Sequence, residues 1–96
     1  KRVSYELFCS GKSLDEIAVE RLLSKVTIEG HLAYYVETGD IPVEKLLSYD
    51  KYNRILAYLT THPDNVSQLS AIKDGLGSDY SYAEIKFALA AYHHDS

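Results

Sequence analysis

The stretch from residue 13 to residue 37, SLDEIAVERLLSKVTIEGHLAYYVE, decides the fold that this sequence predicts. Ser13 and Glu16 have the spacing of a capping box, in which each side chain hydrogen-bonds the backbone N–H of the other at a helix N-terminus. A helix over residues 14–22 is therefore expected, and a longer helix over residues 25–38 follows after a tight turn. Two helices joined by so short a turn are typical of a helix-turn-helix.

Such a motif needs a small residue where the two helices cross and apolar residues on both sides of the turn. Ala18 supplies the small residue, and Leu22, Leu23 and Ile28 supply the apolar ones. Leu22 stands near the position where many such turns carry glycine. We expect a helix-turn-helix whose second helix could lie in a DNA major groove, with a plain helical hairpin as the alternative.

Outside this stretch the apolar residues follow helical spacing, and no sustained alternation indicates strands. A second capping box, SYAE over residues 81–84, opens a last helix. Further short helices are expected over residues 3–9, 43–47, 49–61 and 66–74. The expected fold is all-α, with five to seven short helices. We expect a single domain over residues 1–96, made of a helix-turn-helix half (1–40) and a second packed helical half (41–96).

The composition is that of an ordinary globular protein and limits what the chain can do. A formal net charge of −4 does not favour tight nucleic-acid binding, because phosphate neutralisation needs clustered lysine and arginine. No apolar run approaches the roughly 18 residues that span a bilayer, and no signal peptide is visible. We therefore expect a cytoplasmic protein without membrane contact. Because the chain begins at Lys1 and lacks methionine, we expect a fragment of a longer protein.

Residue patterns that carry catalytic chemistry are missing from the sequence. The single cysteine, Cys9, excludes an intrachain disulfide and is expected in the core. The four histidines lack zinc-ligand spacing, and no glycine-rich phosphate loop stands out. We therefore expect no catalytic residue, no metal and no cofactor in this chain.

Eight of the nine tyrosines fall into two groups. Tyr34 and Tyr49 are expected to be exposed, where a base could stack on them. Most of a larger set is expected in the core with the hydroxyl groups in water. That set is Tyr5, Tyr35, Tyr52, Tyr58, Tyr82 and Tyr92.

The second helix of the motif is the expected DNA-contacting element. Its outward residues are expected to be Lys25, Thr27, Glu29, Gly30, His31, Tyr34 and Glu37. Lys25 and Thr27 would contact phosphate near the N-terminus, where the helix dipole favours an anion, and His31 and Tyr34 would reach base edges or sugar. One lysine against two glutamates predicts weak binding. Gly30 costs about 1 kcal/mol relative to alanine, which close approach of a partner or of another helix would offset.

Two motifs lie in order along the chain. The first combines ELF at residues 6–8, GK at 11–12, SLDEIA at 13–18, Arg21 and TIEGHL at 27–32. The second is IKDGLGSDYSYAEIKFALA at 72–90. Together they resemble the C-terminal helix-turn-helix domain of bacterial RecQ-type ATP-dependent DNA helicases, over about residues 4–92. Lys12, in the glycine–lysine turn, is a further candidate DNA contact.

This resemblance implies a parent enzyme that unwinds DNA with ATP and Mg²⁺ in DNA repair and recombination. The catalytic residues of such a parent would lie outside this chain. The chain would then be an accessory module that binds DNA weakly and without sequence specificity. One alternative is an acidic protein-interaction or regulatory module that docks on the helicase core or on another repair protein. A third is a transcription regulator, since TIEGHL alone is also similar to LuxR-type DNA-binding domains, although the motif over residues 81–90 does not belong to that pattern.

Overall fold

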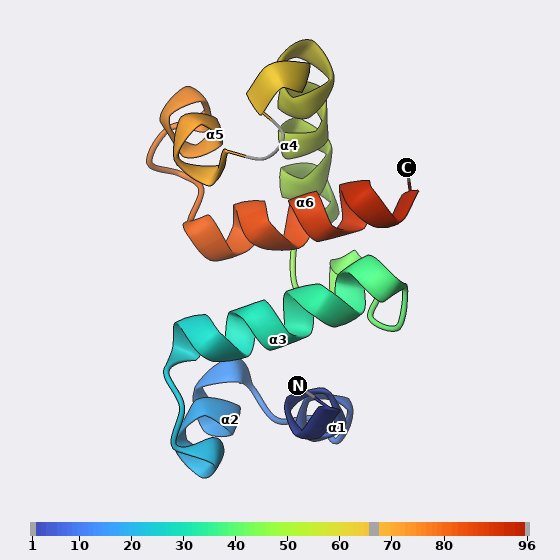
Figure 1. The fold of residues 1–96 in the computed structure, drawn as a ribbon, viewed down its shortest axis with the longest axis vertical. Coiled ribbons are helices and arrows are strands. Elements are labelled where there is room, and N and C mark those ends of the chain that lie inside the picture. The colour runs from blue at the N-terminus through green and yellow to red at the C-terminus, as the bar shows by residue number, and fades with distance from the viewer. Residues whose placement is uncertain (1, 66–67, 96) are drawn as a thin grey trace.

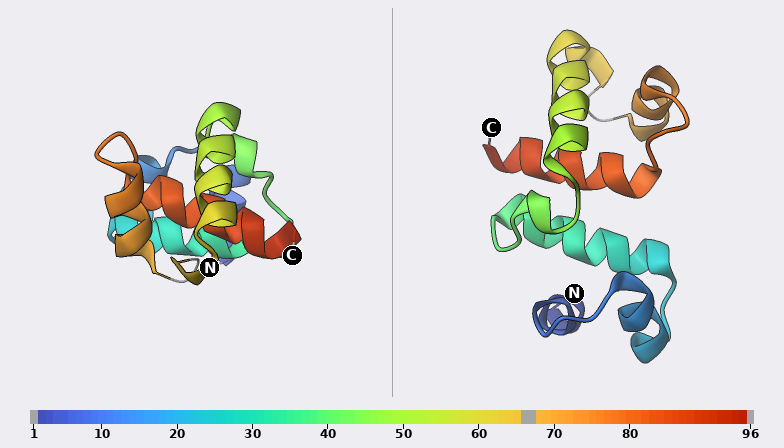
Figure 2. Two further views of the ribbon diagram at one scale, coloured as in Figure 1. Left: turned by 90° about the horizontal axis from the view of Figure 1, so that it is seen from above. Right: turned by 180° about the vertical axis from the view of Figure 1, so that it is seen from behind.

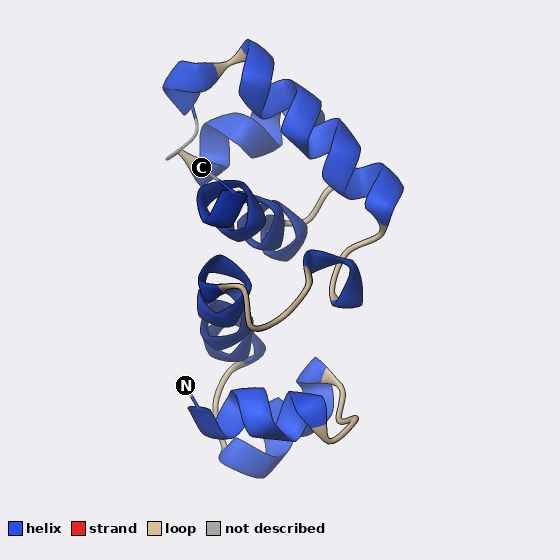
Figure 3. Ribbon diagram, turned by 90° about the vertical axis from the view of Figure 1, so that its right-hand side faces the viewer, coloured by secondary structure: helices blue, strands red, loops and turns tan. Residues whose placement is uncertain are grey.

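The computed structural model describes residues 2–65 and 68–95, and this part of the chain contains helices and no strands (Figures 1 and 3). The α-helices are α1 (Arg2–Cys9), α2 (Leu14–Arg21), α3 (Lys25–Thr38), α4 (Tyr49–Thr61), α5 (Leu69–Leu76) and α6 (Tyr82–Asp95). Two short 3-10 helices, η1 (Val43–Lys45) and η2 (Pro63–Asn65), lie before and after α4. The all-α prediction is confirmed.

Hydroxyl side chains fix where several helices begin. At α2, Ser13 Oγ accepts the Glu16 N–H at 3.2 Å and Glu16 Oε1 accepts the Ser13 N–H at 2.8 Å. The same two bonds join Ser81 and Glu84 at α6, with lengths of 3.2 and 2.9 Å. Helix α3 ends at Gly39, whose φ of +90° lies in the left-handed region that glycine tolerates. Both expected capping boxes are therefore present.

Helices α3 and α6 occupy the centre of the molecule and run side by side in the same direction (Figures 1 and 2). Helices α1 and α2 pack on the side of α3 away from α6, and α4 and α5 pack on the side of α6 away from α3. The chain thus forms two three-helix units, α1–α3 and α4–α6, which meet through their third helices.

Each unit has a hydrophobic cluster, and α6 contributes to both. The first cluster contains Ile17, Ile28, Leu32, Ala33, Val36 and Ile41, with Phe87, Ala90 and Ala91 from α6. The second contains Leu47, Ile55, Leu59, Ile72 and Tyr80, with Ile85, Ala88 and Leu89 from α6. The helical period places these two sets from α6 on roughly opposite faces. Helix α6 is therefore buried between α3 on one side and α4 and α5 on the other.

Three side chains that were expected in the core are exposed. Leu22 is 90% exposed because it occupies a left-handed position after α2 and does not continue the apolar face of that helix. Cys9 is exposed at the last position of α1. Tyr82 is 49% exposed at the first position of α6, before the buried face of that helix begins at Ile85. The other tyrosines of the expected set are half-buried.

Two expected helices differ from the observed ones. The first two residues of the helix expected over 66–74 lie outside the described residues, and α5 runs from Leu69 to Leu76. It passes through Gly75 because the left-handed φ of +94° falls at Gly77. A Cβ atom on Gly75 would collide with the Tyr58 ring, so glycine allows α4 and α5 to approach. The helix expected over 43–47 is the shorter η1.

Candidate nucleic-acid interface

The hairpin of α2 and α3 has the geometry of a helix-turn-helix. Ile17 in α2 and Ile28 in α3 are both 0% exposed and hold the two helices together. At the turn, the Leu23 N–H donates to Ala18 O at 3.0 Å, and Ser24 Oγ then accepts the Thr27 N–H at 3.2 Å to start α3. The expected helix-turn-helix is therefore formed by local hydrogen bonds and by a buried pair of isoleucines.

Helix α3 is covered on two sides and keeps one exposed face. Ile28, Leu32, Ala33 and Val36 are buried among α1, α2 and α6. Helical spacing places Val26, Thr27, Gly30, Tyr34 and Glu37 on the remaining side. Of these, all but Gly30 are exposed. This face is the surface of α3 that a nucleic acid could reach.

The two lysines among the predicted DNA contacts lie in ion pairs. Lys25 Nζ lies 3.3 Å from Asp15 Oδ1, and Lys12 Nζ lies 3.4 Å from Glu20 Oε1. Both pairs are exposed to solvent, where such interactions contribute little and exchange readily. A phosphate at either lysine would therefore compete with a carboxylate of α2.

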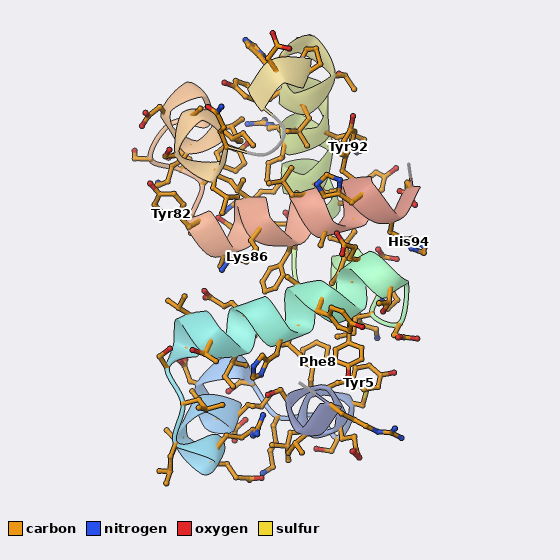
Figure 4. The ribbon with its side chains drawn as sticks, in the orientation of Figure 1. Tyr5, Phe8, Tyr82, Lys86, Tyr92 and His94 are labelled. Carbon is orange, nitrogen blue, oxygen red and sulfur yellow. The ribbon has the colours of Figure 1, made fainter. Side chains whose placement is uncertain are left out.

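Thr27 and Tyr34 lie on the exposed face of α3. The Thr27 hydroxyl is 2.8 Å from Ser24 Oγ, close to the N-terminus where the helix dipole favours an anion. No acidic residue occupies the first turn of α3. Tyr34 is 44% exposed and packs its ring edge-to-face on Tyr35 at 5.1 Å. Tyr35 in turn stacks on Tyr5 of α1 at 4.5 Å, and Figure 4 shows Tyr5 beside α3.

His31 faces α1 and not solvent, which corrects its expected outward orientation. Its Nδ1 lies 2.9 Å from Ser4 Oγ, and the Arg21 Nη1 group donates to the same oxygen at 3.0 Å. Ser4 is 0% exposed. His31 lies three residues after Ile28 and four before Tyr35, so helical spacing could have revealed this orientation. Sequence reasoning missed Ser4 and Arg21, which form a polar link among α1, α2 and α3.

The predicted residues thus divide in space. Lys25, Thr27 and Tyr34 belong to α3, with the first two in its N-terminal turn. Lys12 lies before α2 and lines an open hollow of about 460 Å³ with apolar neighbours, Lys45 and Asp40. His31 belongs to the contact between helices.

Glu16 and Glu84 have lowered pKa values, and both belong to capping boxes. Hydrogen bonds from Ser13 lower the pKa of Glu16. Burial raises the pKa of Glu84, but hydrogen bonds from Lys51 and Ser81 outweigh it and lower the pKa overall. Glu16 therefore keeps a negative charge beside the helix-turn-helix at neutral pH. This negative charge repels a phosphate that approaches the hairpin from the α2 side.

Over residues 2–65 and 68–95, no group of three or more histidine, cysteine, aspartate or glutamate side chains could hold a metal ion. No helix in these ranges is both long and apolar enough to cross a membrane.

Comparison with known proteins gives one family. A family model described as a helix-turn-helix domain matches residues 1–89. No curated protein and no solved structure matches the chain. The match spans both three-helix units and therefore extends well beyond the α2–α3 hairpin.

Proposed function

The chain belongs to this helix-turn-helix domain family, and we propose that it is an accessory nucleic-acid-binding module of a RecQ-type ATP-dependent DNA helicase. The observation that carries the proposal is the exposed face of α3, which presents Thr27 in the N-terminal turn and Tyr34 about two turns further along the helix. In helix-turn-helix proteins the second helix enters the major groove and its N-terminal residues contact base edges.

Charge sets the expected strength and character of this binding. The chain carries 10 lysines and arginines against 14 aspartates and glutamates, and both candidate lysines are paired with carboxylates. Few counterions would be released on binding, so the affinity should be low. The exposed face of α3 carries no arginine, asparagine or glutamine to form bidentate contacts with bases, so the contact should lack sequence specificity. Such a module adds contacts to a parent protein that holds DNA by other means.

The helicase context rests on the two motifs over residues 4–32 and 72–90, which resemble RecQ-type helicases in the same order. In that context the parent would bind ATP and Mg²⁺ and act in DNA repair and recombination. The chain itself would be neither catalytic nor cofactor-binding. Its role would be to position DNA for the helicase core.

The direct test is a titration of the chain with labelled single-stranded, duplex and forked DNA at two salt concentrations, read by fluorescence anisotropy. Lys25→Glu and Tyr34→Ala should both weaken salt-sensitive binding. Tyr82→Ala is the control, because Tyr82 is 49% exposed on α6, outside the α2–α3 hairpin. Absence of binding to every DNA form at low salt would refute the proposed nucleic-acid contact.

The helicase context needs a separate test. The chain should raise the DNA affinity of a RecQ-type helicase core when it is fused to the C-terminus of that core. A fusion that carries Tyr34→Ala should lose most of the gain. An unchanged affinity for forked DNA in the unmodified fusion would argue against the accessory role, whatever the isolated chain binds.

A further inference from the structure

The helix-turn-helix turn carries an apolar patch that the proposed DNA contact does not use. Val19 is 76% exposed, Leu22 is 90% exposed and Val26 is 64% exposed. They are the three most exposed aliphatic residues in the described part of the chain, and they fall within eight positions around the turn. We call them the turn patch. Clustered exposed aliphatic residues mark interaction sites more often than scattered ones do.

Leu22 is held in this patch against its own conformational preference. Its φ of +55° and ψ of +41° place it in the left-handed region, and it is the one non-glycine residue with positive φ among the described residues. A left-handed leucine costs about 1 kcal/mol relative to a right-handed one, and its side chain contributes almost no burial in return. Glycine would relieve the strain without loss of packing. The stability of the isolated chain therefore does not explain leucine at this position.

Carboxylates surround the α2 side of the turn patch. Asp15, Glu16 and Glu20 line an open hollow together with Val19. Glu16 is held ionised by its hydrogen bonds from Ser13. Lys25 and Lys12 pair with Asp15 and Glu20 at the surface, which leaves the group of five charges net negative. An apolar patch with an acidic border fits a partner that offers apolar and basic side chains together.

This charge pattern selects among possible occupants. In a symmetric dimer of this chain the three carboxylates would face their own copies, and like charges at an interface are unfavourable. Duplex DNA would bring phosphates against the same carboxylates and would offer little apolar surface to Leu22. A basic amphipathic helix complements both the apolar patch and its acidic border. Its apolar face would pack on the exposed aliphatic side chains, and its lysines or arginines would pair with the carboxylates.

We propose that the turn patch is a docking site for an amphipathic helix of a protein partner, with Leu22 as the apolar anchor and Asp15, Glu16 and Glu20 as contacts for lysine or arginine. Val26 lies on the same exposed face of α3 as Thr27 and Tyr34, so the docking site adjoins the proposed DNA contact. It differs from that contact in its apolar anchor, Leu22, and in its acidic border. The patch is small, so the complex should be transient.

The test uses a fluorescein-labelled 14-residue peptide of leucine and lysine at helical spacing, titrated with the chain. Leu22→Gly should raise the Kd about tenfold, as expected for loss of a central apolar anchor. The same variant should unfold at a higher temperature, so weaker binding would not reflect loss of the fold. Val3→Ser is the matched control, because Val3 is 51% exposed on α1 and should leave the Kd unchanged.

Further measurements test whether the turn patch is the site that binds the peptide. A peptide with alanine in place of leucine keeps the charge and the helix, and it should bind much more weakly. Amide chemical shifts of the chain should move at residues 15–26 when the leucine peptide is added. Equal binding of both peptides, shifts elsewhere, or no binding would overturn the proposal. Concentration-dependent dimerisation that Leu22→Gly abolishes, or amide shifts at Val19 and Leu22 when duplex DNA alone is added, would assign the patch to a different occupant and would also overturn it.

Discussion

The two three-helix units have the same arrangement, but they use their third helices differently. Helix α6 buries Ile85 and the run from Phe87 to Ala91, whereas α3, of equal length, buries four residues and keeps an exposed face. Helix α6 packs against both hydrophobic clusters, so little of its middle is available for binding. The comparison shows that the α4–α6 unit supports α3 from behind, while the α1–α3 unit presents the surfaces that can contact a partner.

The two units also differ in how polar side chains join their helices. In the first unit, the buried Ser4 hydroxyl links His31 and Arg21 inside the contact among three helices. In the second unit, separate half-buried contacts join the helices: Lys51 Nζ donates to Glu84 Oε2 at 2.7 Å, and the Tyr58 hydroxyl donates to Ala71 O at 3.4 Å. The helices of α1–α3 therefore share one buried polar group, whereas those of α4–α6 are joined in pairs.

The largest expected effect follows from the contact between the units. Phe87 is 4% exposed and projects from α6 into the first cluster. Phe87→Ala should lower the free energy of unfolding by about 3–5 kcal/mol, because it removes a buried ring and leaves a cavity between α3 and α6. Urea unfolding followed by circular dichroism measures this loss.

The control for Phe87 lies on the same helix. Tyr82→Ala removes a side chain that is 49% exposed, so its cost should stay below about 1 kcal/mol. Similar losses for Tyr82→Ala and Phe87→Ala would mean that α6 does not hold the two units together through the Phe87 ring.

Two glycines inside helices test how closely the helices of each unit pack. A Cβ atom at Gly75 would collide with the Tyr58 ring, whereas a Cβ atom at Gly30 would meet nothing within 4 Å. Gly75→Ala should therefore destabilise the chain by about 1–3 kcal/mol through overpacking. Gly30→Ala should stabilise it by about 0.5–1 kcal/mol, because alanine has the better helix propensity. Thermal unfolding of the two variants should move in opposite directions, and a shift in the same direction would contradict the packing at one of these sites.

A smaller effect is expected at the buried serine. Ser4→Ala removes the oxygen that contacts both His31 and Arg21. The free energy of unfolding should fall by about 1–2 kcal/mol, because these two side chains lose a buried hydrogen-bond partner. Ser10→Ala on the exposed segment after α1 is the control, since its hydroxyl donates only to Leu7 O at 2.7 Å. Chemical denaturation of both variants measures the difference, and equal losses would show that the Ser4 contacts add no stability.

The smallest effects concern the two capping boxes. The lowered pKa of Glu84 means that its charge stabilises the fold above the ordinary value of 4.5, and that this contribution is lost as the pH falls through the lower folded value. Glu84→Gln should cost about 0.5–1 kcal/mol at pH 7, since glutamine can keep the capping box but not the ion pair with Lys51. The variant and the parent chain should converge in stability as the pH falls below the lowered pKa of Glu84.

Glu16→Gln provides the matched comparison for Glu84. Glu16 accepts the Ser13 N–H in the same way, and it has no contact that corresponds to Lys51. Its replacement should therefore change the urea midpoint at neutral pH less than Glu84→Gln does. A larger change at Glu16 would show that the ion pair of Glu84 with Lys51 adds little to the stability of the capping box.

Much of the fold could be predicted from the sequence because local chemistry fixes the helix ends. The bounds of α3 follow from Ser24 and Gly39, and both capping boxes form as expected. Burial was harder to predict. Leu22 follows the apolar spacing of α2, but the left-handed turn directs it into solvent. The neighbours of each face of α6 also depend on packing between distant segments, which spacing alone does not specify.

Part of the candidate site could also be predicted, because that part depends only on local helix geometry. Thr27 and Tyr34 lie on the exposed face of α3 because helical periodicity is a local property. The ion pairs of Lys12 and Lys25 with acidic residues of α2 depend on how side chains meet across the turn. His31 is directed to α1 by the buried Ser4, a residue that carries no recognisable motif.

The place of α6 in both clusters also bears on how the chain folds during synthesis. On the ribosome, α1–α5 emerge first, and at that stage neither cluster has the side chains that α6 supplies. Ile28, Leu32 and Val36 on one side and Ile55, Leu59 and Ile72 on the other remain without their full cover until the last helix leaves the exit tunnel. Both cores should therefore be completed in one late step, and a chain stalled before residue 82 should be recognised by chaperones that bind exposed apolar segments.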